Sequence, residues 1–230
     1  MVSIAIDGPS GAGKSTLSRR LAETLGFLYV DTGALYRALG LYALRRGVSP
    51  SDPRGVQELL PGVGVSLAHG PGGQRVFVNG EDVTDAIRAH DVSGAASDIS
   101  ALPAVRAYLL DTQRAFARAQ SVVMDGRDIG TVVLPDADLK IFLTATPEDR
   151  ARRRHRELLD KGACIDYETV LRDLKVRDRN DEMRAAAPLR PAPDAVVLDT
   201  TGNAFEMSYK LLLGVVKGKL ASCSTEYSTE

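Results

Sequence analysis

The sequence is poor in cysteine, and this shortage bears on where the protein works. It contains 2 cysteines in 230 residues, Cys164 and Cys223, which lie far apart and match no C-x-x-C pattern. Small secreted domains that depend on disulfides carry a denser framework of cysteines, so we do not expect one here. A reducing compartment is the natural alternative, and we expect a cytoplasmic protein.

Long apolar runs, a leader pattern and an excess of charge are missing as well. No apolar stretch reaches the roughly 18 residues that a membrane helix needs, and no basic segment followed by an apolar one suggests a signal peptide. The formal net charge is -1, so general attraction to nucleic acid or to an anionic membrane is not expected. The 3 histidines are scattered without other ligands at metal-binding spacing, and we assign them no metal or catalytic role.

The chain does contain a large excess of arginine over lysine. Of its 29 basic residues, 22 are Arg and 7 are Lys. Guanidinium groups can hold a phosphate through two parallel hydrogen bonds, which suits a protein that handles phosphate. A GC-rich genome explains the same bias, and composition alone does not choose between the two explanations.

Short apolar runs alternate with helical patterns along most of the chain. With 44% hydrophobic residues over this length, we expect one α/β domain with a small insert, or at most two small domains. Alternating strands and helices favour a five-stranded parallel sheet with helices on both faces. The expected strands are 2–6, 27–30, 122–124, 139–143 and 195–198. The expected helices are 14–25, 34–46, 92–119 with a break near Pro103, 147–161, 167–179 and 204–216.

One segment, from 61 to about 83, has a different texture. Apolar residues alternate with polar ones at 63–67 and again at 76–78, and Asn79-Gly80 is a strong hairpin signal. This predicts a small antiparallel insert in the α/β domain. The tail after Gly218 is rich in Ser, Thr and Glu, and we expect it to be poorly ordered.

The first expected strand runs into a phosphate-binding pattern. Residues 8–15 match G-x-x-x-x-G-K-S/T between a strand and a helix, the context that a P-loop requires. We expect Lys14 to reach the β- and γ-phosphates of ATP and the Ser15 hydroxyl to bind Mg²⁺. The alternative is a glycine-rich turn without a ligand. The expected donor-binding residues are Gly8, Pro9, Ser10, Gly11, Ala12, Gly13, Lys14, Ser15 and Thr16.

Two further polar segments follow the second and third expected strands. They are 31–37, which ends in Arg37, and 125–128, which contains Arg127 and Asp128. Ligands of open parallel sheets bind beyond the carboxyl ends of the strands, so both segments should lie near the P-loop. Taken singly, each has a plainer explanation: Asp31 or Thr32 caps a helix with Arg37 in solvent, and 125–128 is an ordinary turn.

Four sequence blocks together resemble the bacterial-type cytidylate kinases. In order, they read IDGPSGAGKST, DTGALYR, DGRDIGTVVLPDADLKIFLTA and RDRNDEMRAAAPL. The resemblance covers about 2–217, and the third block is the most specific, since adenylate kinases carry a phrase close to DGFPR there. It implies a P-loop kinase domain over 1–217, with an acceptor-binding insert at about 61–100 and a helical lid at about 146–186.

The resemblance also implies a reaction, in which the γ-phosphoryl group of ATP passes to CMP or dCMP with the help of Mg²⁺. Catalytic roles fall on Lys14, Arg127, Asp128 and Arg184. Carried over by position, Thr32, Arg37 and Arg127 would contact the acceptor phosphate, Arg106 and Asp128 the cytosine, Ser97, Arg177 and Asp181 the ribose, and Arg184 the acceptor and the transferring group. UMP or another small acceptor is the alternative.

Two positions depart from the pattern of that family. Thr32 stands where Ser is common, which keeps the hydroxyl. Asn180 stands where many members have a lid arginine, so one phosphate contact is lost or comes from Arg179. The arginines of 150–156 form either a solvated face or phosphate contacts.

Two other classes of protein compete with a kinase. A GTP-dependent switch would need an N-K-x-D phrase, which the sequence lacks. A nucleotide-binding structural protein without turnover is the other alternative. Nothing in the sequence demands an oligomer, and we expect a monomer.

Overall fold

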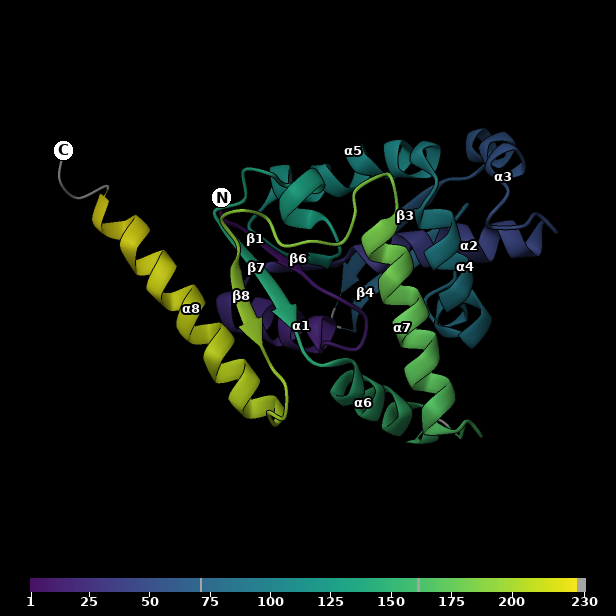
Figure 1. The fold of residues 1–230 in the computed structure, drawn as a ribbon. Helices are drawn as coiled ribbons and strands as arrows, with labels where there is room; N and C mark the ends of the chain where they lie inside the picture. Colours follow the sequence, from purple (N-terminus) through teal and green to yellow (C-terminus); the bar gives the residue numbers. More distant parts are fainter. Residues whose placement is uncertain (71, 161, 227–230) are drawn as a thin grey trace.

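A five-stranded, fully parallel sheet forms the centre of the protein, as the computed structural model shows for residues 1–70, 72–160 and 162–226. The strand order is β2-β6-β1-β7-β8, so the glycine-rich segment leaves from the middle of the sheet (Figure 1). This confirms the predicted fold class. The strands are β1 (Ser3–Asp7), β2 (Leu28–Asp31), β6 (Val122–Gly126), β7 (Leu139–Thr144) and β8 (Val196–Asp199).

Helices cover both faces of this sheet because the central strands are apolar on both sides. One core joins β1, β6 and β7 to α1 and α8, and another joins the opposite face to α5. Figure 1 shows α5 and α1 on opposite sides of the strands. The helices are α1 (Lys14–Leu25), α2 (Thr32–Arg45), α3 (Pro53–Leu59), α4 (His90–Ser100), α5 (Pro103–Ala119), α6 (Pro147–Asp160), α7 (Tyr167–Met183) and α8 (Phe205–Glu226).

The predicted antiparallel insert is present as a second, three-stranded sheet. Its strands are β3 (Val65–Gly70), β4 (Gly73–Val78) and β5 (Glu81–Asp82), in the order β3-β4-β5. Asn79 and Gly80 turn the chain between β4 and β5, both with positive φ, as a type I′ hairpin turn requires. Val76 and Val78 pack toward α2, which ties the insert to the same core as α4 and α5.

The sequence missed several short elements. Helix α3 and the single turns Leu60–Gly62, Ala86–Arg88 and Ile129–Val133 are too short to give a periodic pattern. The turn at Ile129–Val133 is π-helical and begins directly after the predicted acceptor residues Arg127 and Asp128, which follow β6.

The C-terminal helix is longer than expected. The sequence predicted that it would end at 216, with poor order after Gly218, but α8 continues to Glu226. Leu212 and Val216 are fully buried against the sheet, and Leu220 packs partly against the same core, so burial extends the helix past the predicted stop. Residues 227–230 lie outside the described residues. Within the described ranges, no helix is both long and apolar enough to cross a membrane.

Candidate functional site

The glycine-rich segment between β1 and α1 can only be built with glycine at its key positions. Gly8 has φ +146°, and a Cβ on it would lie 1.9 Å from the carbonyl oxygen of Leu143 in β7. Gly11 and Gly13 also have positive φ, the left-handed region in which side chains are strained. The chain therefore wraps tightly over the end of β1 and leads into the N-terminus of α1, where backbone N–H groups suit an anion.

Lys14 is the first residue of α1, and its side chain is almost fully buried. Its ammonium group donates a hydrogen bond of 2.7 Å to the carbonyl oxygen of Pro9. Burial lowers the pKa of Lys14 to about 7, helped by the positive charge of Arg127 and opposed by the carboxylate of Asp125. The lysine is thus held inside the loop, in an environment that favours the approach of an anion.

Asp125 is a buried residue near the end of β6 and lies close to Lys14. Burial raises the pKa of its carboxyl group, and the charge of Asp31 acts in the same direction while Lys14 acts against it. The hydroxyl of Tyr29 donates to a carboxylate oxygen at 3.1 Å, and the hydroxyl of Thr32 donates to the backbone carbonyl at 2.8 Å. Tyr29 of β2 thus fixes the side chain of Asp125, and Thr32, the first residue after β2, fixes its main chain.

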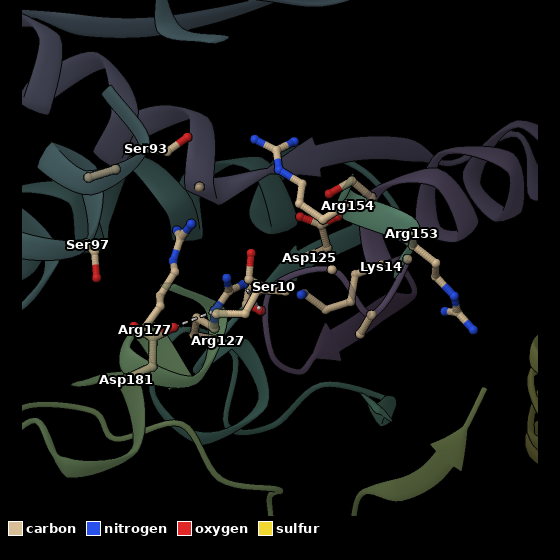
Figure 2. Close-up of a pocket in the computed structure, with 18 of the residues that line it drawn as sticks. Ser10, Lys14, Ser93, Ser97, Asp125, Arg127, Arg153, Arg154, Arg177 and Asp181 are labelled. Atoms are coloured by element: carbon tan, nitrogen blue, oxygen red, sulfur yellow. Dashed lines mark hydrogen bonds and ion pairs between the residues drawn. The ribbon is translucent and has the colours of Figure 1, made fainter. Parts of the chain in front are cut away.

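A single pocket of about 1040 Å³ brings the two predicted sides of the site together. The glycine-rich loop forms one wall, and the segments after β2 and β6 form another with parts of α4, α5 and α7. Parts of α6, the loop after β8 and the start of α8 also line the pocket. In Figure 2 the pocket runs from Ser93 and Ser97 on one side, past Lys14 and Asp125, to Arg153 on the other. The predicted residues that line it are Ser10, Gly11, Ala12, Gly13, Lys14, Ser15, Thr16, Thr32, Arg37, Ser97, Arg106, Arg127, Asp128, Arg177, Asp181 and Arg184. Gly8 and Pro9 form the loop behind this wall.

Ion pairs hold the guanidinium groups at the acceptor end of the pocket. Arg127 donates to Asp181 at 3.0 Å, so the turn after β6 is paired with α7, and Figure 2 marks this contact. Arg106 of α5 pairs with Asp128, whose other oxygen lies 3.5 Å from Arg184. Both carboxylates are nearly buried, so the charges neutralise one another inside the pocket.

Arg177 differs from its neighbours. Its Nε is buried and has no hydrogen-bond partner among the described atoms. Burial lowers the pKa of this side chain to about 10, and the nearby charge of Arg127 acts in the same direction. The group stays protonated at neutral pH, so a half-buried positive charge with spare hydrogen-bonding capacity in the pocket wall points to an anionic ligand.

The segment after β2 combines both explanations that the sequence allowed. The carboxylate of Asp31 caps α2 by accepting from the backbone N–H of Ala34 at 3.1 Å, as the plainer explanation expected. The same carboxylate accepts from Arg37 at 2.6 Å, and Arg37 lines the pocket. The solvated arginine of the plainer explanation is therefore wrong, because Asp31 holds Arg37 against the site.

The arginines of α6 do not form one solvated face. Arg150 is buried, and it pairs with Asp178 of α7 through two hydrogen bonds of 3.0 and 2.6 Å. It also donates to the carbonyl oxygens of Ala145 and Ser10, so one guanidinium joins α6, α7 and the glycine-rich loop. Periodicity along α6 could not reveal this, because the partners lie in other elements.

Arg153 and Arg154 of α6 line the donor side of the pocket. Arg153 donates to the backbone carbonyl of Thr200 at 2.6 Å, in the loop between β8 and α8. Asn180 also lines the pocket, whereas Arg179 is exposed and does not. In this structure Arg179 therefore points away from the pocket that Asn180 lines.

Asp7 is a buried carboxylate to which the sequence analysis gave no role, since the expected strand ended at residue 6, whereas β1 includes Asp7. Its two oxygens accept the backbone N–H groups of Ile129 and Gly130, each at 2.8 Å. An acidic residue that ends a buried strand directly before a glycine-rich loop was the available signal. Its partners, more than a hundred residues away, were not visible in the sequence.

The acidic, histidine and cysteine side chains of the described residues form no group of three that could hold a metal ion alone. Mg²⁺ commonly binds through one or two protein oxygens together with phosphate and water, so a dedicated protein cage is not required.

Comparisons with known proteins agree with this geometry. A sequence model of the family described as cytidylate kinase matches residues 4–216. The chain is 51% identical over 214 residues to the cytidylate kinase of Pelotomaculum thermopropionicum, with 93% of this chain and 95% of the relative covered. It is 48% identical over 219 residues to the cytidylate kinase of Geobacillus kaustophilus, with 95% and 98% covered.

Among solved structures, an uncharacterized protein from Eubacterium ventriosum aligns with a TM-score of 0.51 at 13% identity. The alignment covers 94% of this chain and 99% of that protein, and at this identity it supports only the similarity of fold. The family match and the relatives near 50% identity carry the assignment. The chain belongs to the cytidylate kinase family of nucleoside monophosphate kinases.

Proposed function

We propose that the protein transfers the γ-phosphoryl group of ATP to CMP or dCMP, giving ADP and CDP or dCDP. The observation that carries this proposal is one pocket with two anion-binding walls, the glycine-rich loop with Lys14 and the guanidinium cluster of Arg37, Arg127 and Arg177. A phosphoryl donor and a phosphorylated acceptor fit such walls face to face. All the residues come from one chain, so we also propose that a monomer is sufficient for activity.

On the donor side, the loop amides and the α1 N-terminus would hold the β- and γ-phosphates, with Lys14 between them. The Ser15 hydroxyl and the Asp125 carboxylate offer hard oxygen ligands that suit Mg²⁺. When bound, this ion would neutralise charge on the β- and γ-phosphate oxygens. Lys14 keeps its positive charge in the presence of the triphosphate because the anion raises its pKa.

On the acceptor side, no strong general base is needed because the attacking phosphate is already an anion near neutral pH. The task of the site is to bring two anions together in line and to cancel their repulsion. Arg37 and Arg127 would exchange their carboxylate partners, Asp31 and Asp181, for phosphate oxygens. Asp181 would then be free to accept from a ribose hydroxyl, beside Ser97.

Asp128 and Arg106 would recognise the base. Cytosine presents an amino donor at N4 and acceptors at N3 and O2, which match a carboxylate and a guanidinium. Uracil presents an acceptor at O4, which an ionised Asp128 would repel. A buried polar mismatch of this kind costs about 1–3 kcal/mol, so UMP should be a poor acceptor.

The α6–α7 pair would close over the nucleotides and exclude water, so that ATP phosphorylates the acceptor and is not hydrolysed. Arg150 links both helices to the glycine-rich loop, so the pair can respond to a ligand in that loop.

A substrate panel tests the proposed function. ADP formation from ATP is measured with CMP, dCMP, UMP, AMP and no acceptor. We expect efficient turnover with CMP and dCMP, a kcat/KM about 5- to 150-fold lower with UMP, and little ADP without acceptor. Equal rates with CMP and UMP would contradict the base-recognition argument, and acceptor-independent ADP release would contradict the kinase itself.

The low pKa of Lys14 gives a pH prediction for donor binding. Lys14 of the free protein has a pKa of about 7, whereas the bound triphosphate keeps Lys14 protonated to a higher pH. Binding therefore takes up a proton above pH 7, and affinity should fall by up to about tenfold between pH 7.5 and 8.5. Calorimetry of MgATP in buffers of different ionisation enthalpy measures both the affinity and the proton uptake. In Lys14→Arg the cation stays charged, so the pH dependence should disappear.

A further inference from the structure

The carboxylate of Asp7 connects two parts of the pocket that are distant in sequence. It lies at the end of β1, directly before Gly8 of the glycine-rich loop. One oxygen accepts the N–H of Ile129 and the other accepts the N–H of Gly130, both at 2.8 Å. Its side chain is buried and forms no ion pair within the described part of the chain, so these two N–H groups are its main partners.

Those two N–H groups directly follow the acceptor residues Arg127 and Asp128. They belong to the first two residues of the π-helical turn Ile129–Val133. This turn adds no further main-chain pairing to the described sheet, because β6 ends at Gly126. Arg114 of α5 holds the far end of this turn through the carbonyl oxygens of Val132 and Val133, and the Asp7 carboxylate holds the end that follows Arg127 and Asp128.

Close packing around Gly126 and Gly130 also restricts the position of the turn. A Cβ on Gly130 would lie 3.2 Å from the Lys140 side chain and 3.4 Å from the Asp7 carboxylate. A Cβ on Gly126 would lie 2.7 Å from the Ile129 side chain and from the Thr32 hydroxyl. The turn therefore packs closely on β6, on Thr32 and on the end of β1.

On its other side, Asp7 cannot shift without moving the loop. Gly8 packs so tightly on Leu143 that a Cβ there would be 1.9 Å from its carbonyl oxygen. Asp7 itself is paired with Gly126 on one side and Phe142 on the other. The donor loop and the acceptor turn are thus attached to the same two-oxygen contact.

We propose that Asp7 is a positioning residue that holds the Arg127-Asp128 turn in register with the glycine-rich loop and thereby sets the selection of the acceptor base. The inference rests on the proposed function, because it assumes that Asp128 faces the base. Both oxygens must accept, so an ionised carboxylate is required, and an amide provides only one acceptor. Loss of the Asp7 carboxylate should weaken the binding and selection of the acceptor nucleotide and leave the binding of ATP nearly unchanged.

The test compares Asp7→Asn with the wild-type protein in steady-state assays with CMP and UMP at saturating ATP. In Asp7→Asn one of the two turn N–H groups loses its acceptor, so the turn and the Asp128 side chain that it carries are free to shift. We expect KM for CMP to rise about tenfold and the CMP-to-UMP ratio of kcat/KM to fall about tenfold, with KM for ATP within about twofold.

Two further variants keep the test decisive. Leu212→Ala removes a buried side chain of α8 far from the turn, and it should lower the melting temperature without changing the CMP-to-UMP ratio. Asp7→Ala removes both acceptor oxygens and places no amide against the turn, so it should lower the CMP-to-UMP ratio at least as much as Asp7→Asn, and it provides the test if Asp7→Asn does not fold.

The outcomes separate the inference from the function on which it rests. If wild type shows no CMP-dependent turnover, the proposed function fails. If wild type prefers CMP and both Asp7 variants keep that preference, the positioning role of Asp7 is wrong. An equal rise in KM for ATP and CMP in these variants would also overturn it, since it would indicate general damage to the pocket.

Discussion

We expect Lys14→Ala to lower the kcat of CMP phosphorylation by about a thousandfold. The ammonium group is buried inside the glycine-rich loop and held 2.7 Å from the Pro9 carbonyl oxygen, so it is in place before the donor binds. Removing one preorganised charged donor from a transition state of this kind reduces kcat by about 10²–10³ or more. The measurement is the rate of ADP formation at saturating CMP and ATP.

The matched control for that variant is Lys14→Arg, which keeps the charge but changes its shape and reach. It should recover part of the rate, because a cation stays near the phosphates, while the tight loop leaves little room for a guanidinium. Thermal unfolding of both variants shows whether they fold. If a folded Lys14→Ala protein kept more than a tenth of the wild-type kcat, Lys14 would not have the proposed role in catalysis.

We expect Asp128→Ala to lower kcat/KM for CMP by about a hundredfold. Two effects add: the cytosine amino group loses its acceptor, and Arg106 and Arg184 lose the carboxylate that neutralises them. Leaving buried cations without a partner is strongly unfavourable, so the melting temperature should fall as well. Steady-state kinetics with CMP and UMP, run well below the unfolding temperature, give the comparison.

Asp128→Asn separates base recognition from charge balance. The amide has the same shape, and by rotating it can accept from cytosine N4 or donate to uracil O4. We expect the preference for CMP over UMP to shrink toward equality, with UMP turnover rising above its wild-type level. If Asp128→Asn keeps the full wild-type preference, Asp128 does not read the base.

The ion pairs in the pocket suggest how binding and closure are coupled. Arg127 is paired with Asp181 of α7, so under the proposed function an incoming acceptor phosphate would compete with that carboxylate. Release of Asp181 would free it for the ribose and change what α7 contacts. The charges that hold the pocket together in this structure would then also bind the ligand.

Parts of the fold that depend on short-range pattern could be predicted closely. Helix α1 begins at Lys14 and ends at Leu25 as expected, because Gly13 and Gly26 both adopt the left-handed conformation at its ends. The five core strands were recognisable as short apolar runs, since strands of a parallel sheet are buried on both faces. The end of α8 could not be predicted in this way, because its length depends on packing against a distant sheet.

The sequence by itself determined the phosphate-binding loop, the α/β order of elements and the family of the protein. All three depend on residues close together in the chain, where glycine conformation and apolar periodicity act directly. Only the tertiary structure decided which charges meet: Arg150 with Asp178, Arg127 with Asp181, and Asp7 with the turn after β6. These partners come from separate elements, and whether two charges pair depends on their burial and distance, which the folded chain alone sets.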